Sequence, residues 1–140
     1  MTDRVELQTE VDAPRRLVFP MFATAEGLRL WLDAADLEPR VGGALRVRMR
    51  EAEAVGTVVA LDPPQHISYQ WDWLDASLGA PSVVAFDAID HGARTWVTVR
   101  QVGLPTPEQV RIHDEMWRHW LLRFEEACRA LPDKEETTHP

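Results

Sequence analysis

A long amphipathic segment near the C-terminus is the feature that most constrains how this chain can fold. Thr106, Pro107 and Gln109 form a capping box with proline at the first helical position, which predicts that a helix begins there. From there to Pro132, apolar residues recur at alternating steps of three and four, the spacing of one helix face. A helix that is apolar along one side must be covered, and the rest of the chain has to supply the covering surface.

Six segments before this helix are predicted to be β-strands, from alternation of apolar and polar residues, from an apolar run or from a hairpin signal between two of them. They span residues 4–11, 44–50, 55–61, 66–73, 82–89 and 95–102. Two short helical pieces are expected between the first and second strands, one opened by Pro14 and one over residues 25–32, with Pro20 kinking or shortening the first piece. The last five strands follow one another with short turns, which implies antiparallel pairing.

These elements predict an α+β fold in which a curved, antiparallel six-stranded sheet wraps around the long C-terminal helix. A length of 140 residues favours one domain. We expect that domain to cover residues 1–132 and to be followed by a polar, disordered tail over residues 133–140.

Charge and cysteine content exclude several classes of function. Fifteen basic and 23 acidic residues give a net charge of −8, which argues against nucleic acid or an anionic membrane surface as a partner. Residues 1–8 carry charges where a signal peptide needs an apolar core, and no apolar run approaches the roughly 20 residues of a membrane span. Cys128 is the only cysteine, so an intrachain disulfide and a multi-thiolate metal site are excluded. We therefore expect a cytoplasmic protein.

Several short strings occur in a characteristic order along almost the whole chain. They are Val11-Asp-Ala-Pro, Leu28-Arg-Leu-Trp31, Pro39-Arg-Val-Gly-Gly-Ala-Leu-Arg, Gly56-Thr-Val58, Asp62-Pro-Pro, Ile67-Ser-Tyr-Gln-Trp71 and Gly92-Ala-Arg-Thr-Trp-Val-Thr-Val. Together they resemble the START-like (SRPBCC) superfamily, and more narrowly the bacterial homologues of the heat-shock-protein-90 ATPase activator domain. The resemblance implies the helix-grip (Bet v 1-like) fold, with a cavity between sheet and C-terminal helix. Relatives use that cavity for lipids, polyketides, plant hormones or aromatic compounds, and the fold hosts carriers, cyclases, co-chaperones and stress regulators alike.

Six tryptophans stand out in the composition, and most of them fall on the strands and the long helix. The candidate ligand-binding residues are Trp31, Tyr69, Trp71, Trp73, Trp96, His113, Trp117 and Trp120. An aromatic-lined pocket and a core filled by aromatic side chains both explain such a set. His113 interrupts the apolar stripe, either as a polar handle or general base for a ligand or, the interpretation we favour, as a core histidine hydrogen-bonded to a neighbour.

The arginines at positions 46, 48 and 50 alternate with Leu45, Val47 and Met49. If the apolar residues face the core, these arginines face solvent. A shift of one residue in register would instead turn Arg48 into an anion anchor inside the pocket.

Three functions remain open at this stage. The first is a protein that binds a small apolar or aromatic ligand, lipids included, and that forms a possible homodimer. The second is a chaperone-associated or regulatory interaction domain, and the third is a cyclase- or hydratase-type enzyme assisted by His113 or Asp72. No motif predicts a cofactor, a metal site or a catalytic set, because His119 lies off the face of His113 and Cys128 belongs to the apolar stripe.

Overall fold

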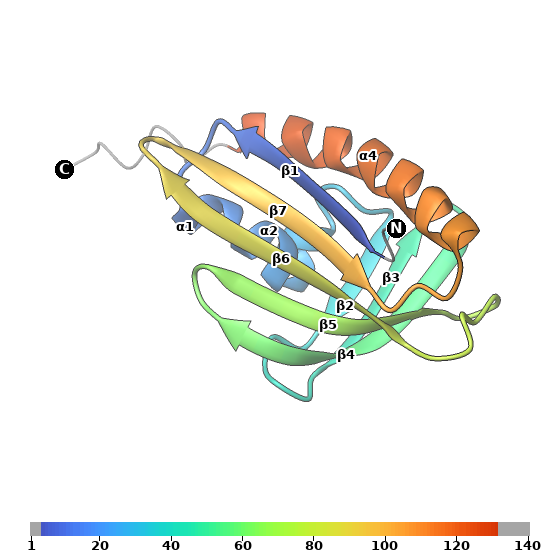
Figure 1. Ribbon diagram of the computed structural model, residues 1–140. Coiled ribbons are helices and arrows are strands. Elements are labelled where there is room, and N and C mark those ends of the chain that lie inside the picture. The colour runs from blue at the N-terminus through green and yellow to red at the C-terminus, as the bar shows by residue number, and fades with distance from the viewer. Residues whose placement is uncertain (1–3, 132–140) are drawn as a thin grey trace.

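The structure is a computed structural model that describes residues 4–131, so the tail predicted over residues 133–140 lies outside the described residues. The elements are β1 (Val5–Val11), α1 (Arg15–Val18), α2 (Pro20–Ala23), α3 (Ala25–Leu28), β2 (Ala34–Leu37), β3 (Ala44–Met49), β4 (Ala52–Asp62), β5 (His66–Trp73), β6 (Ser82–His91), β7 (Arg94–Val102) and α4 (Pro107–Arg129). Figure 1 shows the strands as one curved sheet, with α4 running along it next to β1.

The sheet has seven antiparallel strands in the order β1-β7-β6-β5-β4-β3-β2. The prediction of an antiparallel α+β fold is confirmed, but the prediction of six strands was wrong because β2 was missed. β2 has four residues, too few for a recognisable alternation, and Asp36 within it together with Asp33 just before it suggested a loop. Pairing with β3 makes it a strand, because Ala35 and Leu37 are then buried while Asp36 stays exposed.

Three single helical turns connect β1 to β2, where two short pieces were predicted. Pro20 explains the difference. Proline has no backbone N–H with which to continue α1, so α1 ends at Val18 and Pro20 becomes the first residue of α2. Thr24 then caps α3, its hydroxyl oxygen accepting a hydrogen bond of 3.0 Å from the backbone N–H of Gly27.

The predicted capping box begins α4: Thr106 Oγ1 accepts from the backbone N–H of Gln109 at 3.1 Å. The buried face of the helix consists of His113, Trp117, Trp120, Leu121, Phe124 and Cys128. Near its C-terminal end the helix is tied to β1, where the Thr9 hydroxyl donates to the Glu125 carboxylate. No helix in the described part of the chain is both long enough and apolar enough to cross a membrane.

A chain of buried hydrogen bonds joins α4 to three strands. The indole N–H of Trp117 donates to Gln101 Oε1 on β7 at 2.8 Å, and Gln101 Nε2 donates to Ser82 Oγ on β6 at 2.8 Å. Ser82 Oγ in turn donates to the backbone carbonyl of Trp71 on β5 at 2.8 Å. Because these polar atoms are shielded from water, each bond made here avoids a desolvation cost, and the chain fixes where α4 sits over the sheet.

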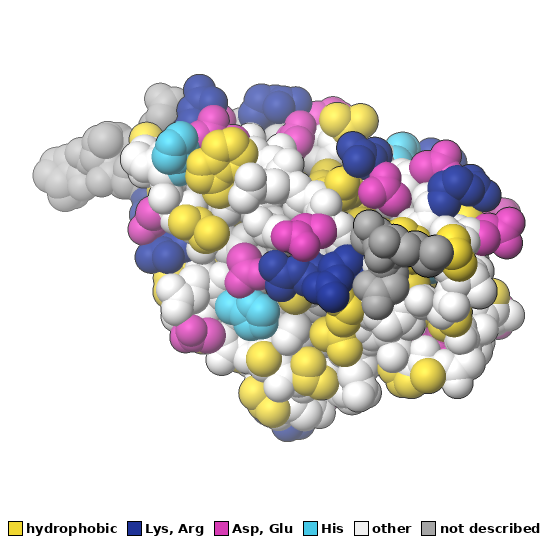
Figure 2. Space-filling model, in the orientation of Figure 1, with side chains coloured by type: hydrophobic (Ala, Val, Ile, Leu, Met, Phe, Trp, Pro, Cys, Tyr) yellow, Lys and Arg dark blue, Asp and Glu magenta, His cyan; other side chains and the backbone are white. Residues whose placement is uncertain are grey.

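The two faces of the sheet differ sharply. Leu45, Val47 and Met49 of β3 are buried while the arginines between them are exposed, so the predicted register is confirmed and Arg48 lies outside the core. Trp96 also lies on the outer face, where its ring packs 5.5 Å from that of His91 (centroid to centroid), because the inward positions of β7 belong to residues such as Val97 and Val99. Figure 2 shows charged side chains of both signs spread over this outer face.

Replacing Gln101 with methionine tests the buried chain. The substitution conserves size but leaves the Trp117 indole N–H without an acceptor, so we expect the free energy of unfolding to fall by about 1–3 kcal/mol. Urea denaturation followed by tryptophan fluorescence measures the change. The matched control is Gln70→Met: Gln70 is an exposed residue of β5 whose side chain accepts a hydrogen bond of 3.3 Å from the Thr57 hydroxyl, and its replacement should stay within about 0.5 kcal/mol of the original protein. Equal losses in both variants would contradict the structural role of Gln101.

Candidate functional site: an apolar groove beside the long helix

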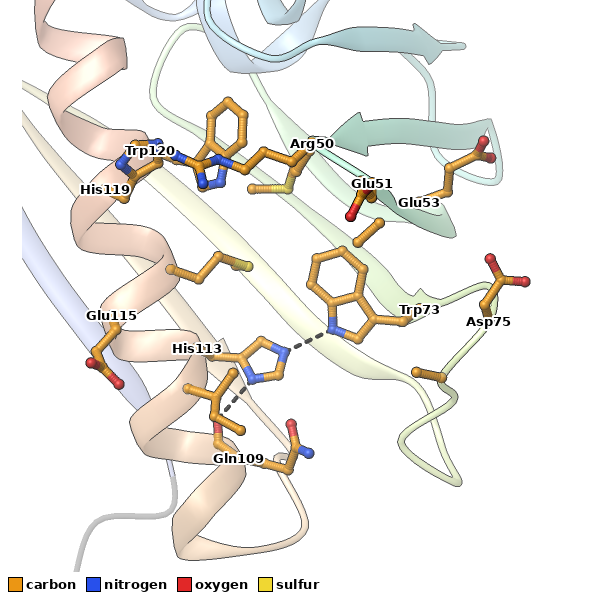
Figure 3. A pocket seen from close by; sticks show the side chains of 15 residues that line it. Arg50, Glu51, Glu53, Trp73, Asp75, Gln109, His113, Glu115, His119 and Trp120 are labelled. Carbon is orange, nitrogen blue, oxygen red and sulfur yellow. Dashed lines mark hydrogen bonds between the residues drawn. The ribbon is translucent and has the colours of Figure 1, made fainter.

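An apolar groove of about 750 Å³ opens between the β3–β4 hairpin, the end of β5 and the first half of α4. It is lined by Met49, Arg50, Glu51, Ala52, Glu53, Trp73, Asp75, Ala76, Gln109, Ile112, His113, Glu115, Met116, His119 and Trp120. Figure 3 shows the side chains of α4 facing Trp73 and the hairpin across this space. The curl of the sheet creates the groove, because it brings a hairpin from the far end of the strand order towards the middle of the helix.

Trp73 and His113, which both line the groove, form a hydrogen-bonded pair. The Trp73 indole N–H donates to His113 Nε2 at 2.9 Å, and His113 Nδ1 lies 2.7 Å from the backbone carbonyl of Gln109 (Figure 3). An indole N–H can only donate and a carbonyl can only accept, so His113 is neutral and carries its proton on Nδ1. Burial lowers the pKa of His113 below its usual value, and the bond to Gln109 only partly opposes that effect.

Arg50 forms the end of the groove nearest the middle of α4. Its backbone φ of 63° lies in the left-handed region that ordinary residues seldom adopt, and its backbone N–H donates to Asp33 Oδ2 at 2.6 Å. Its guanidinium Nη2 lies 3.3 Å from His119 Nε2 on α4. This contact spans the mouth of the groove from hairpin to helix.

Four carboxylates surround the rest of the mouth, and two of them are neutralised by arginines. Glu53 pairs with Arg46 at 2.6 Å, and Glu115 pairs with Arg111 at 2.9 Å. Within residues 4–131, Glu51 and Asp75 have no ion pair. The rim therefore carries positive charge at the Arg50 end and unpaired negative charge on the side of Trp73.

Three of the eight residues predicted from the sequence to bind a ligand line the groove: Trp73, His113 and Trp120. Trp31, Tyr69, Trp71 and Trp117 lie instead in the core, where their rings pack against one another or against Phe86 and Phe124. Trp96 is on the opposite face of the sheet, so the structure does not bring it to the groove.

The polar atoms of the core aromatics are mostly engaged. Trp31 Nε1 donates to the carbonyl of Met21 at 2.7 Å, and the Tyr69 hydroxyl donates to the carbonyl of Phe22 at 3.0 Å. Burial accordingly raises the pKa of Tyr69 far above its ordinary value. Trp71 Nε1 is the exception among the described residues, since it is buried without a hydrogen-bond partner. These side chains fill the interior between sheet and helix, and the groove opens beside them.

Asp72 was the other residue considered for acid–base chemistry, and it points away from the groove. Burial alone would raise its pKa, but hydrogen bonds from the Leu78 backbone N–H, the Ser77 hydroxyl and the Trp73 backbone N–H together lower it. Asp72 is thus an ionised acceptor that holds the loop after β5. Within the described residues, no three His, Cys, Asp or Glu side chains are grouped so as to hold a metal ion.

Several groove residues could not be recognised from the sequence, because none of them stands out in a motif or a periodic pattern. Met116 and Ile112 lie beside the apolar stripe of α4, and Ala52 opens a strand. Arg50 followed the alternation of β3 and was expected to face solvent with Arg46 and Arg48. The turn after Met49 breaks that alternation, and the left-handed backbone conformation of Arg50 cannot be predicted from the sequence.

A family model described as "Activator of Hsp90 ATPase homolog 1-like protein" matches residues 12–129. The chain belongs to this family. No curated protein matches the sequence. The resemblance that the short strings predicted is therefore confirmed at the level of the family.

Solved structures share the fold at low sequence identity. DynU16, a putative protein in the dynemicin biosynthetic locus, superposes with a TM-score of 0.79 at 18% identity over 93% of this chain, which spans 48% of the DynU16 chain. An HSP90 activator from Plasmodium falciparum gives 0.78 at 18% identity, covering 89% of this chain and 95% of that one. The Aha1 dimer from Colwellia psychrerythraea gives 0.77 at 16% identity, covering 93% and 98%. These likenesses establish the helix-grip fold.

The neutral state of His113 predicts how stability changes with pH. Below about pH 6.5 the unfolded chain protonates this histidine while the folded chain resists, so the free energy of unfolding falls as the pH is lowered through that region, by at most about 1.4 kcal/mol per pH unit for one proton. In His113→Gln this contribution is absent, so its unfolding free energy should fall less steeply on acidification. Urea denaturation of both proteins across this pH range measures the two slopes.

The matched control is His119→Gln, on the same helix but outside the Trp73 pair. If His119→Gln flattens the profile as much as His113→Gln does, or if the original protein and His113→Gln run parallel, His113 is not the group responsible.

Proposed function

We propose that this protein binds a small apolar or aromatic molecule in the groove beside α4. The observation that carries the proposal is the combination of an apolar floor, built by Met49, Trp73, Met116 and Trp120, with a polar rim. The volume of about 750 Å³ falls within the range of roughly 300–1,000 Å³ typical of small-molecule sites. Met49 and Trp120 are nearly buried, whereas Trp73 and Met116 leave apolar surface open to water, and covering that surface with a ligand gains free energy.

Binding accounts for the groove better than catalysis does. General acid–base work needs a group that can reach the substrate with a nitrogen or oxygen to spare. His113 uses both ring nitrogens within the protein, and Asp72 is engaged by three donors on the other face of the sheet. The ligand would thus meet mainly the Trp73 indole, because His113 is itself buried, and this favours a carrier or sensor.

A chaperone-associated role is the second candidate, and the family favours it. The matching model is named for an activator of the Hsp90 ATPase, and the Plasmodium falciparum protein called an HSP90 activator is aligned over 95% of its length. Purified Hsp90 from the same source tests this: stimulation of its ATPase by this protein would support the role, and no stimulation together with no binding in an affinity titration would reject it. Native mass spectrometry of the same sample tests the proposed homodimer.

A neutral apolar probe tests the groove directly. N-phenylnaphthylamine should bind saturably, one per chain, with a rise in its fluorescence. Met116→Glu places a charge on the apolar floor, so we expect about tenfold weaker binding, since burying or displacing that charge costs at least about 1.4 kcal/mol. Fluorescence titration gives the dissociation constant.

Leu122→Glu is the matched control, because Leu122 lies on the same helix outside the groove and is 60% exposed. It should leave the affinity unchanged. Equal weakening in both variants, or a probe that does not saturate, would reject the groove as the binding site.

A further inference from the structure

Two basic side chains converge at one end of the groove without a carboxylate between them. Arg50 comes from the β3–β4 turn and His119 from α4, and their closest nitrogens are 3.3 Å apart (Figure 3). Among the described residues, no carboxylate forms an ion pair with Arg50. By contrast, Arg46 on the same hairpin pairs with Glu53 at 2.6 Å. The guanidinium of Arg50 thus keeps donors available at the mouth of an apolar groove.

The backbone holds Arg50 in place at some cost. A φ of 63° is a conformation in which glycine or asparagine would be less strained than arginine. The Asp33 carboxylate, just before β2, accepts a hydrogen bond from the Arg50 backbone N–H at 2.6 Å and also lies 3.7 Å from the Arg123 guanidinium. Asp33 therefore connects the β3–β4 turn to α4. Strained residues that the surrounding structure holds in place occur often at ligand-binding sites.

The other charges of the rim are distributed unevenly between the two sides of the groove. The Glu51 carboxylate lies on the side of Trp73, and Asp75 lies beyond it on the loop after β5 (Figure 3). Both would repel an anion placed at that side. Glu53 and Glu115 are paired with arginines, and Arg123, which packs 4.8 Å from the centre of the Trp120 ring, is paired with Asp33, so Arg50 is the cation of the groove lining that has no ion pair among the described residues. An anionic group is therefore favoured at the Arg50–His119 end and disfavoured at the other side.

We propose that the ligand of this groove is an amphipathic monocarboxylate. Its carboxylate accepts hydrogen bonds from the Arg50 guanidinium beside His119, and its apolar body lies over Met49, Met116 and Trp73. This assignment rests on the proposed function and names the chemical class that the site takes. A charged hydrogen bond from arginine to carboxylate is among the stronger polar contacts available to a protein, so the head group contributes to affinity as well as to orientation.

Three probes with the same tail and different heads test the assignment. Decanoate, decanol and decylamine are titrated below their aggregation concentrations, with tryptophan fluorescence and calorimetry as readouts. We expect decanoate to bind about tenfold more tightly than decanol, and decylamine to bind no better than decanol. Naphthoate against naphthol repeats the comparison with an aromatic body and tells whether the carboxylate is carried by a linear or an aromatic ligand.

Arg50→Gln should abolish the preference for decanoate while leaving decanol binding in place. The control Arg48→Gln, an exposed residue on the outer face of the same hairpin, should keep the preference intact, and unlike Arg46 it is not the ion-pair partner of a groove carboxylate. Arg50→Gly separates binding from folding: glycine relieves the strain at φ 63°, so the midpoint of urea unfolding should rise while the preference for decanoate disappears. If the role of Arg50 were purely structural, its replacement by glycine would not raise the stability of the protein and weaken decanoate binding at the same time.

The outcomes distinguish this assignment from the function on which it rests. If decanol binds as tightly as decanoate, or if Arg50→Gln keeps the preference, the carboxylate assignment is wrong while apolar binding stands. If neither these probes nor N-phenylnaphthylamine bind, both proposals fail.

Discussion

The hydrogen-bond chain from Trp117 through Gln101 and Ser82 to the backbone of Trp71 is the interaction on which the rest of the site depends. It joins α4 to β7, β6 and β5 with polar atoms that water cannot reach. A helix packed by apolar contacts alone can slide or rotate at small cost, whereas a buried donor that loses its acceptor costs about 1–3 kcal/mol. With Trp117 anchored, His113 one turn before it and Trp120 one turn after it are held at the edge of the groove.

Aromatic rings fill the space between helix and sheet at one end of α4 but leave it open at the other, where the groove lies. Towards the C-terminal half of α4, Phe124 packs against Trp31 and Phe22, and these rings close the space between helix and sheet. Towards the N-terminal half, the helix presents smaller or flexible side chains such as Ile112 and Met116, and the β3–β4 hairpin stands off from them. The register shift in β4 between Val58 and Ala60 bends that strand, as bulges do, and contributes to the curl that places the hairpin there. A groove instead of a closed cavity follows from this uneven filling.

Electrostatics at the groove differ from the average over the molecule. The chain carries a net charge of −8, yet the Arg50 guanidinium, which has no ion pair among the described residues, lies beside His119 at one end of the mouth. In the groove lining, His113 is kept neutral by burial and by partners that require a donor at Nδ1 and an acceptor at Nε2. The helix-grip fold supports many functions, so membership of the family leaves the ligand open and the individual side chains of this groove have to carry the argument.

The sequence by itself determined the order of elements, the start of α4, the inward face of β3 and the family, because these depend on periodicity, capping and local strings that neighbours in the chain can encode. It also favoured a hydrogen-bonded core histidine at position 113, and the bonds to Trp73 and Gln109 match that interpretation. Tertiary structure decided the rest. β2 is a strand only through its pairing with β3, and Trp96 was separated from the other tryptophans by the strand face on which it falls. The closeness of Arg50 to His119 joins residues that are 69 positions apart in the chain, and it exists only because the sheet curls until its hairpin meets the helix. Contacts of that kind depend on the sum of strand twist, bulge and side-chain volume over the whole molecule, which no local pattern records.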